Sequence, residues 1–301
     1  MKTSEDVALM SHPQTSYHTM PIDGIDIFYR EAGEKDKPTI VLLHGFPSSS
    51  HMFRNLIPEL AKDYHVIAPD YPGFGHSGNP DHKKFAYTFD KFAELMDKLL
   101  ISLKIDKYAM YVFDYGAPVG FRLFMKHPEK ITAIISQNGN AYDEGLGKFW
   151  DSIKAYWKTS SDKEREAIRW LTSIKATKWQ YENGVSPNDR SKLSPDGWQY
   201  DQSLMDRPGN SDIQLDIFYD YQTNLPLYPK WQEAFRKYKP ALLAVWGKND
   251  EIFVAPGAEA YLRDLPDAEI HMLNTGHFAI ETHGQEIASF ITDFLKRKVK
   301  A

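Results

Sequence analysis

Six short apolar runs recur along the chain and predict buried β-strands. Each run is apolar at consecutive positions and is bounded by Gly, Pro or Asp, which is typical of parallel strands covered on both faces. The runs occupy residues 39–43, 65–68, 108–113, 131–136, 241–246 and 269–273. An earlier segment, 22–29, surrounds Asp23-Gly24 with apolar positions and predicts a β-hairpin.

Between these runs the apolar positions take on the period of a helix. Residues 89–103 place five apolar side chains on one face, namely Phe92, Leu95, Met96, Leu99 and Leu103. Further helices are predicted at 117–126, 258–265 and 285–297. The alternation of strands and helices predicts the α/β class, with a mostly parallel central sheet and helices on both of its faces.

The alternation stops between residues 140 and 227. This stretch is helical in pattern but is broken at Ser186-Pro187, Ser194-Pro195 and Arg207-Pro208-Gly209. We therefore predict a core domain formed by residues 1–139 and 228–301, with a helical cap inserted at 140–227. Five of the seven Trp lie between residues 150 and 198, where they either line an apolar pocket or pack the inserted unit.

Composition narrows the class of protein. The net charge of −5 comes from 36 basic and 41 acidic residues without a long block of one sign, so we expect neither nucleic acid nor a membrane as partner. The absence of Cys excludes disulfides, thiolate metal ligands and a cysteine nucleophile. Residues 1–10 contain no apolar run of signal-peptide length. We expect a cytoplasmic protein, either a monomer or a homodimer.

A polar residue directly follows the run at 108–113. The order is strand, Asp114, Tyr115, then Gly116 and Ala117 at the start of a helix, which is the order of a nucleophile elbow. Asp114 then stands in the nucleophile position. An ordinary aspartate cap on a helix is the alternative for this motif taken alone, and Val112 stands where a small residue is usual.

Three other strand ends complete a catalytic pattern. The loop after residue 43 and the elbow predict an oxyanion hole made by the backbone N–H groups of Phe46 and Tyr115. Asp250 and His277 follow the two last predicted strands. The chain order is therefore nucleophile Asp114, acid Asp250 and base His277.

These motifs together resemble the epoxide hydrolase and haloalkane dehalogenase branch of the α/β-hydrolase superfamily. The resemblance covers about residues 20–300, and it rests on the segments His44-Gly45-Phe46-Pro47, Pro69-Asp70-Tyr71-Pro72-Gly73-Phe74-Gly75-His76-Ser77, the Asp114 elbow and Gly276-His277-Phe278. It implies the α/β-hydrolase fold, an aspartate nucleophile and no cofactor. The family also allows the acid to follow an earlier strand, which makes Asp143 the alternative to Asp250. His271, His277 and His283 show no metal-ligand pattern, so no metal is expected.

A carboxylate nucleophile restricts the substrate. Attack on an acyl carbon would give a high-energy anhydride, whereas attack on a saturated carbon gives an ordinary ester that activated water can hydrolyse. The expected substrate is thus a small apolar alkyl electrophile, either an epoxide or a haloalkane. Dehalogenases of the resembled branch place Trp after the nucleophile, where Tyr115 stands here, and many place Asn or Trp at the position of Phe46. Epoxide hydrolases usually carry the same Trp, so Tyr115 departs from both groups.

Opening an epoxide requires a proton donor, and the resembled epoxide hydrolases use cap tyrosines. Tyr221 is similar to the second of these tyrosines, and Tyr156 is our candidate for the first; the alternative for each is a tyrosine that only packs. Trp150, Trp157 and Phe278 are expected to contact the substrate. Epoxide hydrolysis to a diol is the leading expectation, dehalogenation the second, and an inactive hydrolase fold that serves as a small-molecule receptor the third.

One further motif matches a cofactor-binding pattern without its structural context. Residues 73–78 match the pattern G-x-G-x-x-G of dinucleotide-binding loops, but Asn79-Pro80-Asp81 follow in place of a helix. A phosphate group would find no helix N-terminus there, so no dinucleotide cofactor is expected.

Overall fold

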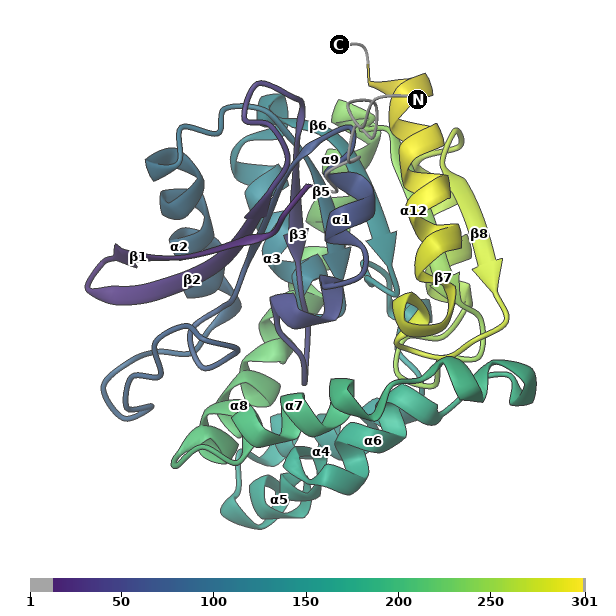
Figure 1. Ribbon diagram of the computed structural model, residues 1–301. Helices are drawn as coiled ribbons and strands as arrows, with labels where there is room; N and C mark the ends of the chain where they lie inside the picture. The colour runs from purple at the N-terminus through teal and green to yellow at the C-terminus, as the bar shows by residue number, and fades with distance from the viewer. Residues whose placement is uncertain (1–12, 300–301) are drawn as a thin grey trace, which may run out of the picture.

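The computed structural model describes residues 13–299, and these contain an eight-stranded sheet (Figure 1). The strand order is β1-β2-β4-β3-β5-β6-β7-β8, and only the pairs β1–β2 and β2–β4 are antiparallel. The strands are β1 (Ser16–Ile22), β2 (Ile25–Ala32), β3 (Thr39–Leu43), β4 (His65–Pro69), β5 (Tyr108–Phe113), β6 (Ile131–Gln137), β7 (Leu242–Gly247) and β8 (Glu269–Leu273). The predicted α/β class with a mostly parallel sheet is confirmed. Residues 1–10, for which no signal peptide is predicted, lie outside the described residues.

The predicted hairpin joins β1 to β2. Ile22 pairs with Ile25, so the two residues between them form the turn. Asp23 and Gly24 have φ angles of 51° and 78°. Two positive φ angles are the mark of the type I′ turn, whose twist matches that of the strands it joins. The Asp-Gly pair therefore sets the register of this hairpin.

Helices cover both faces of the sheet (Figure 1). One face carries α2 (Phe89–Ser102), α3 (Gly116–Lys126), α9 (Tyr228–Tyr238), α10 (Pro256–Glu259) and α11 (Tyr261–Asp264), and the other carries α1 (Ile57–Leu60) and α12 (Ala279–Lys298). Successive side chains of a strand point to opposite faces. In β3, Val41 and Leu43 accordingly join one core, and Ile40 and Leu42 join the other. This double burial explains why the strands read as unbroken apolar runs.

Two predicted helices differ from the structure. The helix expected at 258–265 is divided into α10 and α11, which meet at Ala260. The helix expected at 285–297 begins earlier, at Ala279, and bends at His283, whose φ of −125° is not helical. Short 3-10 helices lie at η1 (Ser50–Phe53) and η2 (Pro128–Lys130). Within residues 13–299, no helix combines the length and the apolar character needed to cross a bilayer.

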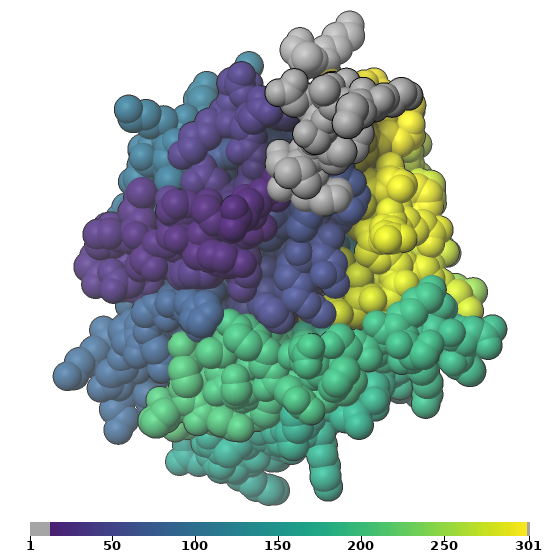
Figure 2. Space-filling model, in the orientation of Figure 1, coloured from purple at the N-terminus to yellow at the C-terminus, as the bar shows by residue number. Residues whose placement is uncertain are grey.

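A helical segment, residues 143–227, separates β6 from β7. It comprises η3 (Asp143–Gly145), η4 (Lys148–Trp150), α4 (Asp151–Thr159), α5 (Asp162–Ala167), η5 (Arg169–Thr172), α6 (Ile174–Glu182), η6 (Pro187–Lys192), α7 (Pro195–Met205), α8 (Asn210–Asp220) and η7 (Tyr221–Leu227). The segment forms a layer along one end of the sheet, and Figure 2 shows it pressed against the rest of the molecule. The domain boundaries at 140 and 227 stay a prediction.

Candidate active site

The turn between β5 and α3 places one side chain, that of Asp114, at the end of the sheet. Asp114 occupies this turn with a φ of 50°, a conformation that is strained for a residue with a side chain. Gly116 allows the close approach, since a Cβ atom there would lie 2.2 Å from the backbone oxygen of Leu43. The strand, the turn and the helix thus hold the Asp114 carboxylate in a fixed position, where it is 3% exposed.

Two backbone N–H groups meet this carboxylate. Phe46 donates to Oδ1 of Asp114 over 2.6 Å, and the N–H of Tyr115, the next residue, acts together with it to lower the pKa of this carboxyl group. Gly45 leaves room for the contact, because a Cβ atom there would lie 2.3 Å from Oδ1. These are the two donors that the sequence predicts for an oxyanion hole. Aimed at the carboxyl group, they can also stabilise negative charge that develops on an ester of it.

His277 lies between two carboxylates. Its Nδ1 is 2.7 Å from Oδ2 of Asp250, and its Nε2 is 3.8 Å from Oδ2 of Asp114. Nε2 has no hydrogen-bond partner. A carboxylate on Nδ1 fixes the tautomer and the ring orientation of a catalytic histidine. Asp143, the alternative acid, is exposed in η3.

Burial and charge tune both partners. Burial raises the pKa of Asp114 to about 6, against the opposing effects of His277 and of the two backbone N–H groups. Burial by itself lowers the pKa of His277, but the neighbouring charges of Asp250 and Asp114 outweigh it and raise that pKa above its usual value. Carboxyl and imidazole groups whose pKa values are shifted by burial and by each other's charge are typical of catalytic sites.

Asn138 orients the acid, a contact that our sequence analysis missed. It follows β6 with a φ of 47°, and its Nδ2 donates to Oδ2 of Asp250 over 2.8 Å. Its Oδ1 accepts the N–H of Gly247 at 2.9 Å. Asn138 therefore ties the end of β6 to the loop that carries Asp250. A polar residue directly after a buried strand, as at Asp114, was the available signal.

A small cavity borders the Asp114 carboxylate. Its volume is about 10 Å³, and it is lined by Phe46, Asp114, Tyr115, Phe149, Trp150, Gln180, Phe218 and Ile252. That is about the room that one water molecule requires. Of the three residues predicted to contact substrate, Trp150 lines this cavity. Trp157 stacks on Tyr221, and Phe278 stacks on Tyr181.

Tyr221 packs against Trp150, one of the residues that line the cavity. Its ring is 4.2 Å from that of Trp150, and its hydroxyl is 3.3 Å from the hydroxyl of Tyr228. Tyr228 in turn accepts a hydrogen bond from Asn140 over 3.2 Å. Burial raises the pKa of Tyr221 well above its usual value, so the phenol keeps its proton. Tyr228, the first residue of α9, is thus the partner of Tyr221.

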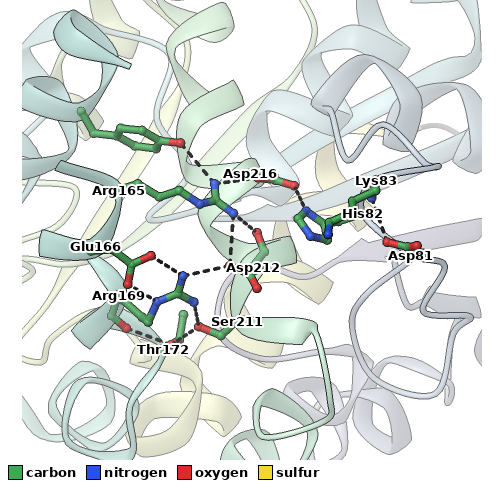
Figure 3. A network of polar contacts seen from close by, with 11 residues as sticks. Asp81, His82, Lys83, Arg165, Glu166, Arg169, Thr172, Ser211, Asp212 and Asp216 are labelled. Atoms are coloured by element: carbon green, nitrogen blue, oxygen red, sulfur yellow. Dashed lines mark hydrogen bonds and ion pairs between the residues drawn. The ribbon is translucent and has the colours of Figure 1, made fainter. Parts of the chain in front are cut away.

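Tyr156 is held away from this group. Its hydroxyl accepts a hydrogen bond from Nη1 of Arg165 over 3.2 Å. Arg165 belongs to the network of Figure 3, in which it also donates to Asp216 over 2.7 Å. Asp216 in turn contacts His82 of the core at 2.8 Å. The structure therefore places Tyr156 in the contacts that bind the helical segment to the core, and not beside Asp114.

The end of α6 packs on the loops that carry the acid and the base. Asn249 donates to the backbone oxygen of Gly184 over 2.8 Å. A Cβ atom at Gly276 would lie 1.8 Å from the backbone oxygen of Asn183, so only glycine fits beside His277. The helical segment thus closes directly over the end of the sheet.

Comparisons with known proteins agree with this architecture. The model of the alpha/beta hydrolase fold family matches residues 38–284. The chain is 47% identical over 287 residues to the uncharacterized hydrolase YNR064C of Saccharomyces cerevisiae, covering 94% of this chain and 98% of that protein. It is 33% identical over 126 residues to a haloalkane dehalogenase of Bradyrhizobium diazoefficiens, which is 42% of this chain and 40% of that one.

A solved structure supports the same fold. The epoxide hydrolase VrEH1 from Vigna radiata superposes with a TM-score of 0.73 at 22% identity, covering 96% of this chain and 99% of that one. At this identity the likeness concerns the fold alone. With the family model matching most of its length, the chain belongs to the alpha/beta hydrolase fold family and is a hydrolase of that fold.

Proposed function

We propose that this protein hydrolyses an epoxide to a vicinal diol through a covalent ester on Asp114. The observation that carries the proposal is the carboxylate at the elbow. The backbone N–H of Phe46 binds it, and the free Nε2 of His277 lies 3.8 Å away. A carboxylate in this position suits attack on a saturated carbon, and the imidazole suits activation of the water that follows.

The first step forms the ester. A carboxylate oxygen of Asp114 attacks a ring carbon, the carbon–oxygen bond of the epoxide breaks, and the ring oxygen takes a proton from Tyr221. A phenol is a suitable acid for a developing alkoxide. Tyr228, whose hydroxyl is 3.3 Å from that of Tyr221, can stabilise the resulting phenolate by donating to it.

The second step releases the diol. His277 takes a proton from a water molecule, whose oxygen adds to the ester carbon of Asp114. The N–H groups of Phe46 and Tyr115 stabilise the oxyanion, and the bond between this carbon and the alkyl oxygen then breaks. His277 returns its proton to the departing oxygen, and the proton released as Asp114 ionises restores the Tyr221 hydroxyl.

Two contacts favour an epoxide over a halide. A halide leaves as an anion and needs N–H donors, for which tryptophan indoles are well suited. Here the indole N–H of Trp150 donates to the backbone oxygen of Ile252 at 3.0 Å, and that of Trp157 donates to Phe218 at 2.7 Å. Both indole donors are therefore occupied, whereas the hydroxyl of Tyr221, the proposed acid, contacts another hydroxyl, that of Tyr228.

Isotope labelling tests the covalent step. In a single turnover with enzyme in excess in ¹⁸O-water, we expect the label in the peptide that contains Asp114 and none in the first product. His277→Gln should accumulate the ester and raise the protein mass by that of the substrate. His271→Gln, which changes a histidine stacked on Phe290, is the control and should turn over normally.

The reaction class is tested by two substrates of equal heavy-atom number, 1,2-epoxybutane and 1-bromobutane, together with an ester, p-nitrophenyl acetate. We expect turnover of the epoxide to exceed that of the other two. A labelled first product together with unlabelled Asp114 would contradict the covalent mechanism, and faster release of bromide than of diol would replace epoxide hydrolysis by dehalogenation.

A further inference from the structure

One wall of the cavity carries an unpaired polar group. Gln180 of α6 lines the cavity together with Asp114, although its side chain is a primary amide. It is 2% exposed, and its Nε2 is buried without a hydrogen-bond partner. Leaving a buried amide unpaired destabilises a folded protein, so such groups are rare and call for a partner that binds from outside the chain.

The helix around Gln180 is held on both sides. Trp179 stacks on Phe149, with ring centres 5.9 Å apart and planes 4° from parallel. Tyr181 stacks on Phe278 at 4.0 Å, and its hydroxyl donates to Asp201 over 2.5 Å. Because both neighbours are fixed, α6 holds Gln180 at the cavity, and turning the helix to satisfy the amide would break these contacts.

Most other donors around the cavity are already used. The backbone N–H of Phe46 donates to Asp114, and the indole N–H of Trp150 donates to the backbone oxygen of Ile252. The Tyr115 hydroxyl is buried and also has no partner. Its ring packs among phenylalanine rings, with Phe89 at 5.1 Å and Phe218 at 6.1 Å. Gln180 is thus one of two candidates for a donor to a ligand, and the only one carried by the helical segment among the residues that line this cavity.

We propose that Gln180 determines substrate specificity by donating its amide N–H to an oxygen carried beside the epoxide ring. This inference rests on the proposed function and narrows it. The substrate class becomes small epoxides with a hydroxyl, ether or carbonyl oxygen on the carbon next to the ring, in place of wholly apolar epoxides. A site that contains a buried donor discriminates strongly against an analogue without the acceptor, because the donor then stays unpaired.

Two epoxides of equal heavy-atom number test this role: glycidol, which carries the hydroxyl, and 1,2-epoxybutane, which carries a methyl group instead. For the wild-type protein we expect kcat/KM to favour glycidol by about 10- to 100-fold. Gln180→Met keeps the length of the side chain but removes the donor, and should bring the ratio to within about threefold of unity. Its melting temperature should equal or exceed that of the wild type, because an unpaired amide is lost.

Gln214→Met is the matched control. Gln214 is a buried glutamine of α8 that donates to Asn210 at 3.3 Å and is not among the residues that line the cavity. This variant should retain the wild-type preference for glycidol. A Gln180 that only packs would lower the melting temperature and the rates for both epoxides alike, and that result would overturn the inference.

The remaining outcomes are equally decisive. Equal rates for the two epoxides in the wild type, or a preference that survives in Gln180→Met, would overturn the specificity role while leaving epoxide hydrolysis intact. Loss of the preference in Tyr115→Phe but not in Gln180→Met would transfer the role to the Tyr115 hydroxyl. If the wild type opens neither epoxide, the proposed function falls and this inference falls with it.

Discussion

At the scale of single residues, the positions of two protons control the proposed reaction. Asp114 must be ionised to attack, and His277 must be neutral to activate water. Burial raises the pKa of Asp114 to about 6, and the adjacent carboxylates raise that of His277. As the pH falls, Asp114 becomes neutral and His277 becomes charged, so both groups lose the form that the reaction needs.

The pH profile of kcat/KM should accordingly have an acidic limb only. We expect activity to decrease as the pH falls through the pKa of His277, which lies above its usual 6.5, and further through that of Asp114, about 6. Above these values activity should stay level up to about pH 9, because burial keeps the Tyr221 phenol protonated there. Initial rates with an epoxide across this range provide the measurement. An alkaline limb near neutrality would show that a different acid protonates the ring oxygen.

A second prediction concerns the proton donor. Tyr221→Phe removes the hydroxyl but keeps the ring that packs on Trp150, so the melting temperature should change little. Loss of a general acid lowers the rate by roughly 10²- to 10⁴-fold, and epoxide turnover should fall by that order. Tyr156→Phe, which loses a hydroxyl that contacts Arg165, is the matched control and should retain its activity. Equal loss in both variants would count against the assignment of Tyr221.

The three residues of the proposed triad could be picked out from the sequence because each follows a buried apolar run. Asp114, Asp250 and His277 are polar residues that follow apolar strands, which makes them visible in a short window of sequence. The structure brings the three together. Asn138 also directly follows a buried run, at the end of β6, but our sequence analysis did not single it out. Gln180 lies within a helix and carries no such signal. Gln180 is notable because its buried amide has no hydrogen-bond partner. That property follows from how segments far apart in the chain pack together, and a sequence does not show it.

At the scale of elements, the parallel strands were the most predictable part of the fold. The runs at 39–43 and 108–113 coincide with β3 and β5, since burial on both faces leaves a continuous apolar signature. Helix limits were less certain, because they depend on tertiary contacts. Helix α12 begins at Ala279 and bends at His283, whereas the sequence pattern predicts that the helix begins only after this bend, at residue 285.

The contact between α3 and β3 supplies a prediction at this scale. Gly116→Ala would place a Cβ atom 2.2 Å from the backbone oxygen of Leu43, which cannot move without distorting the sheet. We expect the free energy of unfolding to fall by about 1–3 kcal/mol, and activity to fall further because Asp114 is displaced. Urea unfolding measures the first effect and epoxide turnover the second.

Gly284→Ala is the control for this change. Gly284 lies within α12, and a Cβ atom there would meet no atom within 4 Å. Alanine is favoured over glycine in a helix by roughly 1 kcal/mol, so this variant should be at least as stable as the wild type. Equal stability of Gly116→Ala and the wild type would show that α3 does not need so close an approach.

At the scale of the whole molecule, a buried carboxyl group joins the helical segment to the core. Asp201 of α7 accepts a hydrogen bond from Tyr181 over 2.5 Å and another from Ser48 over 3.2 Å. Ser48 belongs to the loop that also contains Phe46. Burial raises the pKa of Asp201 to about 8, so the folded protein holds this proton more tightly than the unfolded chain does.

This linkage predicts how stability depends on pH. The folded-state pKa is raised, so the contribution of Asp201 is complete below its unfolded pKa of about 4 and is lost as the pH rises toward 8. Asp201→Asn removes the titration. Relative to the wild type, its free energy of unfolding should therefore increase with pH, by up to about 1.4 kcal/mol per unit between pH 5 and pH 8.

Denaturant unfolding at several pH values gives this comparison. Asp196→Asn changes an exposed carboxylate of the same helix, α7, and serves as the control, for which no comparable pH-dependent gain is expected. A constant difference between Asp201→Asn and the wild type over this range would mean that Asp201 is ionised throughout in the folded protein.

The strand order also bears on how the protein is made. β5, which leads to Asp114, pairs with β3 and β6, whereas β7 and β8 are added at one edge and are synthesised last. Domains generally fold as units, and pairings of distant segments form slowly. The proposed nucleophile is therefore present in the growing chain before the base is. Under the proposed mechanism, an epoxide that reached Asp114 at this stage would remain attached to it, so the final strand and the loop that follows it turn a stoichiometric trap for alkylating agents into a catalyst.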